Sequence, residues 1–325
     1  MGTPRSDVGL TVDAFSAREV PDGRTRVCDL SVSSEGCDTV VTGTVSTHDL
    51  ARRLFTLLRE VPDVDRAASS VRVLSDVASD RTVTDTAVPV RSDPDQAAEQ
   101  ATQLLYGAEV VAYDADGEWR RVTAPDGYVG WAAAEAIASA ESLEANAVLR
   151  ANVELDDGTF LPIGTPGEAV AEDDSTVEVR FRSGETATVP AESLSRPSGL
   201  PSGQDILDIA RQFAGTEYEW GGMTTAGIDC SGLVWVSYRV FGIELPRDTD
   251  QQQTVGVAVP RDELRPGDLL FFPGHVAIST GGSGYVHAHG SSGGFVESSL
   301  DPDDEGYLAD LDDGLTCCRR LLPEN

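Results

Sequence analysis

A single cysteine stands where a helical pattern begins. Cys230 lies in the polar segment 227–234, after which apolar residues recur at the spacing of a helix with one buried face. Asp229 and Ser231 are both residues that cap the start of a helix. The unpaired backbone N–H groups and the dipole of such a helix start would lower the pKa of a thiol there. We therefore predict an activated cysteine nucleophile, and a buried core cysteine is the alternative.

Three of the four histidines are crowded downstream of this cysteine. The runs around His275 and around His287 and His289 are predicted to be strands, and the glycine-rich segment 281–284 between them predicts a β-hairpin. With a loop of residues 281–283, His275 would lie across from His289 and one diagonal step from His287, all on one face. A register change of one residue would move His275 to the opposite face.

A cysteine helix followed by an imidazole-bearing hairpin suits a thiol peptidase. One imidazole would accept the proton of the Cys230 thiol, and a second polar group would fix the orientation of that imidazole. Zinc binding by Cys230, His275 and His287 is an alternative, but the sequence lacks the closely spaced ligand pairs of zinc sites. We expect no metal and no other cofactor.

Short motifs between residues 203 and 325 resemble, in order and spacing, the NlpC family of papain-like cell-wall cysteine peptidases. The motifs are YEWGG at 218–222, DCSG at 229–232, LPRD at 245–248, LRPGDLLFF at 264–272, HVAI at 275–278 and VHA at 286–288. The resemblance implies an α+β fold in which the cysteine helix packs on an antiparallel sheet. It further implies that Cys230 is the nucleophile, His275 the base and His287 the residue that orients His275, although face parity would also allow His289.

The resemblance also suggests which residues hold the substrate. The Cys230 backbone N–H and the Tyr218 hydroxyl would stabilise the oxyanion. In relatives, the residues that bind the L-Ala-γ-D-Glu part of a wall peptide match Asp229, Ser231, Arg247 and Asp248. An arginine there can hold a carboxylate through two parallel bonds, and Asp229 can pair with a free ammonium. Asp229 and Ser231 would alternatively serve only as helix caps.

The chain ahead of the peptidase segment is predicted to contain three smaller units. Residues 1–80 have the pattern of two strands, a helix and a strand, a small α/β unit without identifiable chemistry in which His48 is a surface residue. Residues 81–140 and 141–198 have the strand and turn pattern of two SH3-like β-barrels. A linker rich in Pro, Gly and Ser then leads into the peptidase domain, residues 199–325.

The first of these barrels resembles the bacterial SH3-type domain of the branch that cleaves γ-D-glutamyl–diamino-acid bonds. Its motifs lie at 103–111, 116–119 and 126–131. The resemblance implies that Tyr128 reaches over the active site and that Glu99 holds the substrate amine. Barrel core is the alternative for Tyr128 and the preferred interpretation for Trp131. The second barrel is expected to act as a spacer.

Together these patterns predict a cysteine peptidase that hydrolyses γ-D-glutamyl–diamino-acid isopeptide bonds in small peptidoglycan-derived peptides with a free N-terminal L-Ala. Two alternatives remain open. One is a non-catalytic protein that binds wall peptides, and the other is an amidase or acyltransferase of the same fold. The complete set of one cysteine and two histidines favours the enzyme.

The composition of the chain limits its partners and its compartment. The 55 acidic and 24 basic residues give a net charge of −31, which argues against nucleic acid and against an anionic membrane as partners. Residues 1–7 lack the apolar region of a secretory signal, and no apolar run is long enough to span a membrane. The five cysteines, an odd number that includes adjacent Cys317 and Cys318, are expected to be free thiols. We therefore expect a cytoplasmic monomer that binds a small peptide.

The same negative charge predicts a dependence of stability on salt. With 40% hydrophobic residues, the chain is too apolar for an acidic disordered protein. Concentrated salt would screen the repulsion among its carboxylates. We hypothesise a halophilic protein whose melting temperature rises between low and molar KCl in a thermal unfolding experiment. Greater stability at low salt would contradict this hypothesis.

Overall fold

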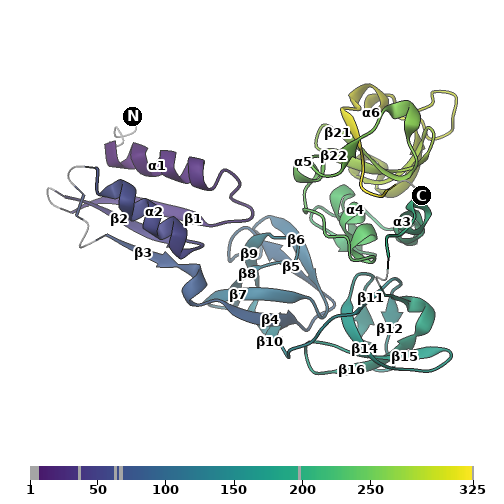
Figure 1. The fold of residues 1–325 in the computed structure, drawn as a ribbon, viewed down its shortest axis with the longest axis horizontal. Coiled ribbons are helices and arrows are strands. Elements are labelled where there is room, and N and C mark those ends of the chain that lie inside the picture. The colour runs from purple at the N-terminus through teal and green to yellow at the C-terminus, as the bar shows by residue number, and fades with distance from the viewer. Residues whose placement is uncertain (1–6, 36–37, 62–63, 66–68, 197–198, 324–325) are drawn as a thin grey trace.

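The computed structural model describes residues 7–35, 38–61, 64–65, 69–196 and 199–323. Successive sheets follow one another along the chain, from a three-stranded sheet near the N-terminus to a six-stranded sheet in the C-terminal region (Figure 1). Among the described residues, none of the helices has both the length and the apolar content needed to cross a membrane.

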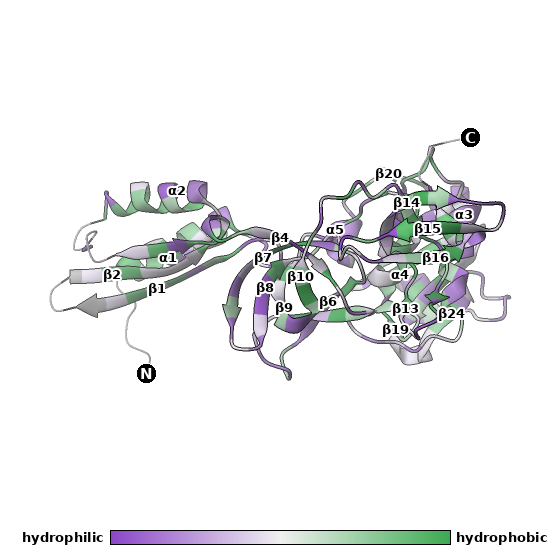
Figure 2. Ribbon diagram, turned by 90° about the horizontal axis from the view of Figure 1, so that it is seen from below, coloured by the Kyte–Doolittle hydropathy of each residue, from purple (hydrophilic) through white to green (hydrophobic). Residues whose placement is uncertain are grey.

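The N-terminal unit combines two helices with a three-stranded sheet. Its elements are α1 (Asp7–Glu19), β1 (Cys28–Glu35), β2 (Asp38–Val45), α2 (His48–Leu58) and β3 (Ser70–Val73). The central strand β2 is antiparallel to β1 and parallel to β3. Figure 2 shows this unit projecting from the rest of the molecule.

The predicted strand–strand–helix–strand order of this unit is wrong at its start, because α1 precedes β1. The helix has a weak amphipathic pattern: Val8, Val12 and Phe15 are buried, whereas Leu10 is 56% exposed. The later helix α2 is confirmed together with its predicted cap, since the Thr47 side chain accepts from the Leu50 backbone N–H in the first turn.

Two further sheets follow, each with a hydrophobic core of its own. The first has the strand order β10-β4-β7-β8-β9-β5-β6, and the second has the order β16-β15-β14-β11-β17 with a separate β12–β13 pair. Their strands are β4 (Ser79–Val83), β5 (Ala87–Arg91), β6 (Gln100–Leu105), β7 (Glu109–Asp116), β8 (Trp119–Thr123), β9 (Val129–Ala133), β10 (Ile137–Ser139), β11 (Ala147–Leu149), β12 (Val153–Glu154), β13 (Phe160–Leu161), β14 (Pro166–Glu172), β15 (Thr176–Arg180), β16 (Thr186–Pro190) and β17 (Leu194–Ser195). The SH3-like character of the second sheet stays a prediction.

The C-terminal region packs helices on a six-stranded sheet of order β20-β25-β21-β22-β23-β24. Its elements are α3 (Gly203–Ala210), β18 (Met223–Thr224), β19 (Gly227–Ile228), α4 (Cys230–Arg239), α5 (Thr249–Gln252), β20 (Val257–Ala258), β21 (Pro266–Phe272), β22 (His275–Gly281), β23 (Gly284–His289), β24 (Gly294–Ser299), α6 (Ala309–Gly314) and β25 (Cys317–Arg320). One core joins α3 and α4 to one face of the sheet and also includes Leu105, Val148 and Ile163 from the two smaller units. The helices therefore lie between the large sheet and the smaller ones, as Figure 1 shows.

The hairpin β22–β23 has the predicted register. Ile278 pairs with Val286, which sets His275 across from His289. The turn itself is tighter than predicted, because the pairing continues to Gly281 and Gly284 after a bulge.

Candidate active site

Cys230 begins α4, where backbone N–H groups have no partner within the helix. The Asp229 side chain caps this helix by accepting from the Gly232 N–H at 2.6 Å, and it also accepts from the Gly221 N–H at 2.8 Å. Gly232 permits close packing at this point, since a Cβ there would lie 2.3 Å from the Gly222 carbonyl oxygen. The predicted helix start and its cap are confirmed.

The Cys230 sulfur is buried against the first residues of β22. It lies 3.9 Å from the Thr249 Oγ1, and a hydrogen bond from the backbone N–H of Val276 lowers the pKa of the thiol. Burial outweighs this contact and the charge of Asp229 adds to the effect of burial, so the pKa of the thiol is raised to about 11. The lowered pKa expected from the helix start is therefore wrong for the substrate-free protein, whose thiol is protonated at neutral pH.

His275 and His287 are joined by a direct hydrogen bond. The His275 Nε2 lies 2.8 Å from the His287 Nδ1, and the His287 Nε2 lies 3.1 Å from the Ser298 Oγ. Burial lowers the pKa of His275 to about 4 and that of His287 to about 2. Both imidazoles are thus neutral at pH 7, the form in which a ring nitrogen can accept a proton.

His289 takes no part in this hydrogen bond. Its ring centroid lies 5.3 Å from that of His275, but its Nδ1 is 3.0 Å from the Ser292 Oγ. Its side chain is partly exposed, whereas His287 is fully buried. The geometry therefore favours His287 over His289 as the residue that orients His275.

The strand start brings His275 towards the cysteine. Val276, whose N–H acts on the sulfur, directly follows His275, and the charge of Asp229 raises the pKa of His275 against the effect of burial. Side chains alternate along β22, so Val276 packs in the core shared with α4, whereas His275 shares the other face with His287. The start of β22, where His275 lies, is therefore next to the Cys230 sulfur.

Arg247 is fully buried and does not lie where a substrate carboxylate could reach it. Its Nη1 and Nη2 donate to the two Asp229 carboxylate oxygens at 2.9 and 2.8 Å, and its other donors bond to Thr102, Ser231 and the Gly222 carbonyl oxygen. All its N–H groups are thus used within the chain. The predicted carboxylate grip is corrected: Arg247 instead holds Asp229, and Asp229 holds the helix start.

Tyr128 and Asp248 are brought together across two units of the chain. The Tyr128 hydroxyl donates to the Asp248 carboxylate, while the Tyr128 ring packs in the barrel core. The core interpretation of Tyr128 is confirmed, and its hydroxyl contacts a residue that lines the pocket. That Tyr128 reaches over the active site stays a prediction. Trp131 is buried beneath Arg121, whose guanidinium carbon lies 4.5 Å from the centroid of the indole ring.

A pocket of about 310 Å³ opens beside the cysteine. It is lined by Arg24, Ala101, Tyr218, Trp220, Asp229, Cys230, Ser231, Asp248, Thr249, Asp250 and Gly274. Glu99 is exposed and is not among these residues, so its predicted role in holding the substrate amine is not supported. Sequence reasoning missed Arg24, Trp220, Thr249 and Asp250. No local pattern marks Arg24, because only the packing of separate units brings it to the cysteine.

The described part of the chain offers no group of three or more His, Cys, Asp or Glu residues arranged to hold a metal ion. Its cysteines, Cys28, Cys230, Cys317 and Cys318, are free thiols, and Cys37 lies outside the described residues.

Comparison with known proteins finds family matches for two segments of the chain. Residues 215–306 match the model of the NlpC/P60 family, and residues 90–137 match the bacterial dipeptidyl-peptidase Sh3 domain. The chain is 43% identical over 104 residues to a probable endopeptidase NlpC of Escherichia coli, covering 30% of this chain and 67% of that protein.

Two longer matches extend beyond the peptidase region. A gamma-D-glutamyl-L-lysine dipeptidyl-peptidase of Bacillus subtilis is 27% identical over 217 residues, which cover 58% of this chain and 71% of that protein. The crystal structure of an NlpC/P60 family protein from Bacillus cereus superposes with a TM-score of 0.67 at 22% identity, covering 75% of this chain and all of that one. The two family matches and this structural likeness together confirm the papain-like fold of the C-terminal region and the presence of an SH3 domain before it.

The protonation state of Cys230 can be tested by alkylation. Because its pKa is raised to about 11, the iodoacetamide reaction rate of the substrate-free protein should rise about tenfold per pH unit from pH 6 to pH 9. Mass spectrometry of the labelled peptide measures this rate, and Cys230→Ala supplies the background from the other thiols. A rate that is already constant below pH 8 would mean that the thiolate exists in the free protein, and would contradict the expectation.

Proposed function

Because the chain belongs to the NlpC/P60 family of cysteine peptidases, we propose that it hydrolyses the γ-D-glutamyl–diamino-acid bond of small peptidoglycan-derived peptides. The observation that carries the proposal is the hydrogen-bonded pair of neutral imidazoles, His275 at the start of β22 and His287 on β23. The backbone N–H of Val276, the residue after His275, meets the Cys230 sulfur. The activity named for the Bacillus subtilis relative supports the choice of bond.

The reaction is an acyl transfer from the leaving amine to Cys230 and then to water. The Cys230 sulfur attacks the amide carbonyl carbon while the His275 imidazole accepts the thiol proton, and His275 then returns this proton to the leaving amine. Water next attacks the thioester, which releases the acid and restores the thiol. His287 keeps the His275 ring oriented through their 2.8 Å hydrogen bond.

Stabilisation of the oxyanion is assigned to the start of α4. The Cys230 backbone N–H lies among the unpaired donors of the helix, and the half-buried Tyr218 lines the same pocket. Each donor aimed at a developing oxyanion contributes about 3 kcal/mol of barrier lowering. Burial raises the pKa of Tyr218, which keeps its hydroxyl protonated and able to donate.

The charge of the pocket suits a peptide with a free N-terminal ammonium. Asp229, Asp248 and Asp250 line it with Arg24 as the one cation among the lining residues, and Arg247 lies behind Asp229. An ammonium gains a charge-assisted hydrogen bond at these carboxylates. We accordingly propose a substrate that begins with free L-Ala, a class of small, already released wall peptide.

The division of the chain into units 1–80, 81–140, 141–198 and 199–325 belongs to this proposal. The strands of the first three units belong to different sheets, except that β4 of the second sheet begins at Ser79, and the second and third units have separate cores. We propose that the third unit is an SH3-like domain that acts as a spacer and supports α3 and α4.

The decisive experiment is incubation with L-Ala-γ-D-Glu-diamino acid under reducing conditions in molar KCl. Mass spectrometry should detect L-Ala-D-Glu and the free diamino acid with the wild-type protein, and no products with Cys230→Ala. Binding without cleavage by the wild type would instead indicate a wall-peptide-binding protein. Faster release to hydroxylamine than to water would indicate an acyltransferase.

The two candidate orienting residues can be separated by substitution. His287→Ala should lower kcat by about 100-fold or more with little change of KM, because His275 then lacks its 2.8 Å partner. His289→Ala should lower kcat less than tenfold. His287→Asn should restore part of the lost rate, since an amide can also bond to the imidazole. Equal losses in His287→Ala and His289→Ala would reject the assignment.

A further inference from the structure

A connection in the N-terminal unit lies against the pocket of the cysteine. Residues 20–27 join α1 to β1, and Arg24 within them lines the pocket. The Arg24 carbonyl oxygen accepts from the backbone N–H of Val129 at 2.7 Å, which ties the connection to β9. The connection therefore touches both the barrel and the peptidase region.

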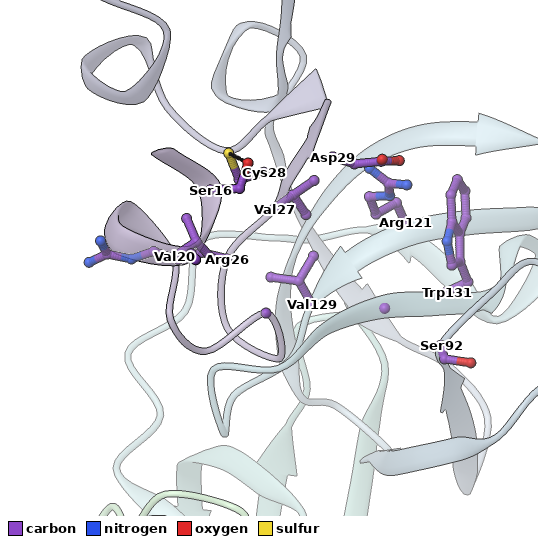
Figure 3. A pocket seen from close by; sticks show the side chains of 13 residues that line it. Ser16, Val20, Arg26, Val27, Cys28, Asp29, Ser92, Arg121, Val129 and Trp131 are labelled. Atoms are coloured by element: carbon purple, nitrogen blue, oxygen red, sulfur yellow. Dashed lines mark hydrogen bonds between the residues drawn. The ribbon is translucent and has the colours of Figure 1, made fainter. Parts of the chain in front are cut away.

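The opposite side of the same connection faces a second cavity. This cavity of about 430 Å³ separates the N-terminal unit from the barrel and is lined by Val20, Val27 and Val129 among others (Figure 3). Side chains therefore leave part of the interface between the N-terminal unit and the barrel unfilled. The connection is held in place mainly by the polar contacts of residues 22–24.

The Arg24 guanidinium joins three carboxylates. It donates from Nη1 to Asp248 at 2.5 Å, from Nη1 and Nη2 to Asp250 at 2.9 and 2.7 Å, and from Nε and Nη2 to Asp22 at 2.9 Å each. These bonds use every N–H of the guanidinium. Arg24 therefore has no donor left for a substrate carboxylate, and its role is to position the carboxylates.

The cluster around Arg24 keeps a negative charge. One guanidinium offsets one of three carboxylates, and Asp248 and Asp250 both line the pocket. The Tyr128 hydroxyl donates to Asp248 from the barrel side. A cationic group at this end of the pocket is attracted, whereas an uncharged acyl group gains no such attraction and leaves the excess negative charge uncompensated.

We propose that Arg24 determines specificity as a positioning residue: it ties the connection 20–27 across one end of the pocket, so that peptides with a free N-terminal ammonium bind and peptides acylated there are excluded. This inference rests on the proposed function, and it gives the N-terminal unit a part in choosing the substrate. The Asp22 side chain reinforces the tie, because it also accepts from the Gln251 Nε2 at 2.7 Å.

The test compares two substrates, L-Ala-γ-D-Glu-diamino acid and the same tripeptide acetylated at its N-terminus. The ratio of kcat/KM for the acetylated peptide to that for the free peptide should rise about tenfold in Arg24→Ala. In this variant the connection 20–27 is no longer tied to the pocket, and the carboxylates are no longer held in position. Arg24→Lys should restore part of the wild-type ratio, because it keeps the charge but cannot join three carboxylates in a plane. Circular dichroism establishes that each variant is folded.

A matched control is Arg52→Ala, which removes one positive charge from the exposed face of α2, where Arg52 pairs with Asp49. It should leave the ratio unchanged. Asp22→Asn provides a second route if Arg24→Ala does not fold, and should shift the ratio in the same direction by a smaller factor.

The outcomes distinguish the two proposals. An unchanged ratio in folded Arg24→Ala and in Asp22→Asn, with the free peptide still cleaved, would overturn the role of Arg24 and leave the proposed function intact. Equal cleavage of both peptides by the wild type would overturn the role of Arg24 and the proposed need for a free N-terminal ammonium, and would leave only the hydrolysis of the γ-D-glutamyl bond standing. Failure of the wild type to cleave the free peptide would overturn both.

Discussion

The buried ion pair between Asp229 and Arg247 is the interaction on which the pocket depends. Removing two charges from water is costly, and only excellent geometry with additional hydrogen bonds offsets that cost. Here both carboxylate oxygens accept from the guanidinium, and Asp229 also accepts from the backbone at the start of α4. Arg247 donates in turn to Thr102 of β6, so the same pair joins the barrel to the cysteine helix. The position of the nucleophile therefore follows from one desolvated network that spans two units.

Burial also sets the chemistry of the reacting groups. Burial of these side chains disfavours their charged forms, which raises the pKa of Cys230 and lowers those of His275 and His287. The free protein therefore holds a neutral thiol and neutral imidazoles, and the charges of the reaction arise when the substrate is attacked. The hydrogen bond between the His287 imidazole and the Ser298 hydroxyl extends the chain of neutral groups behind His275.

The pocket gathers side chains from three parts of the chain. Cys230, Tyr218 and Asp248 come from the C-terminal region, Ala101 from β6 and Arg24 from the connection after α1. The carboxylates and guanidinium at its rim are partly exposed, so salt weakens them more than it weakens the buried Asp229–Arg247 pair. In this strongly acidic protein, the start of α4 therefore stays in place while the ion pairs at the rim of the pocket weaken as the ionic strength rises.

The sequence by itself determined the cysteine helix with its Asp229 cap, the hairpin register that pairs His275 with His287 diagonally, and the family to which these motifs belong. Each of these is encoded locally, in capping residues, in strand alternation or in the spacing of a short segment. Tertiary structure alone decided that Arg247 is buried behind Asp229, that Glu99 lies outside the pocket, that the thiol is protonated, and that Arg24 reaches the pocket. Desolvation and contacts between distant segments control all four, and neither has a signature in the residues beside them in the chain.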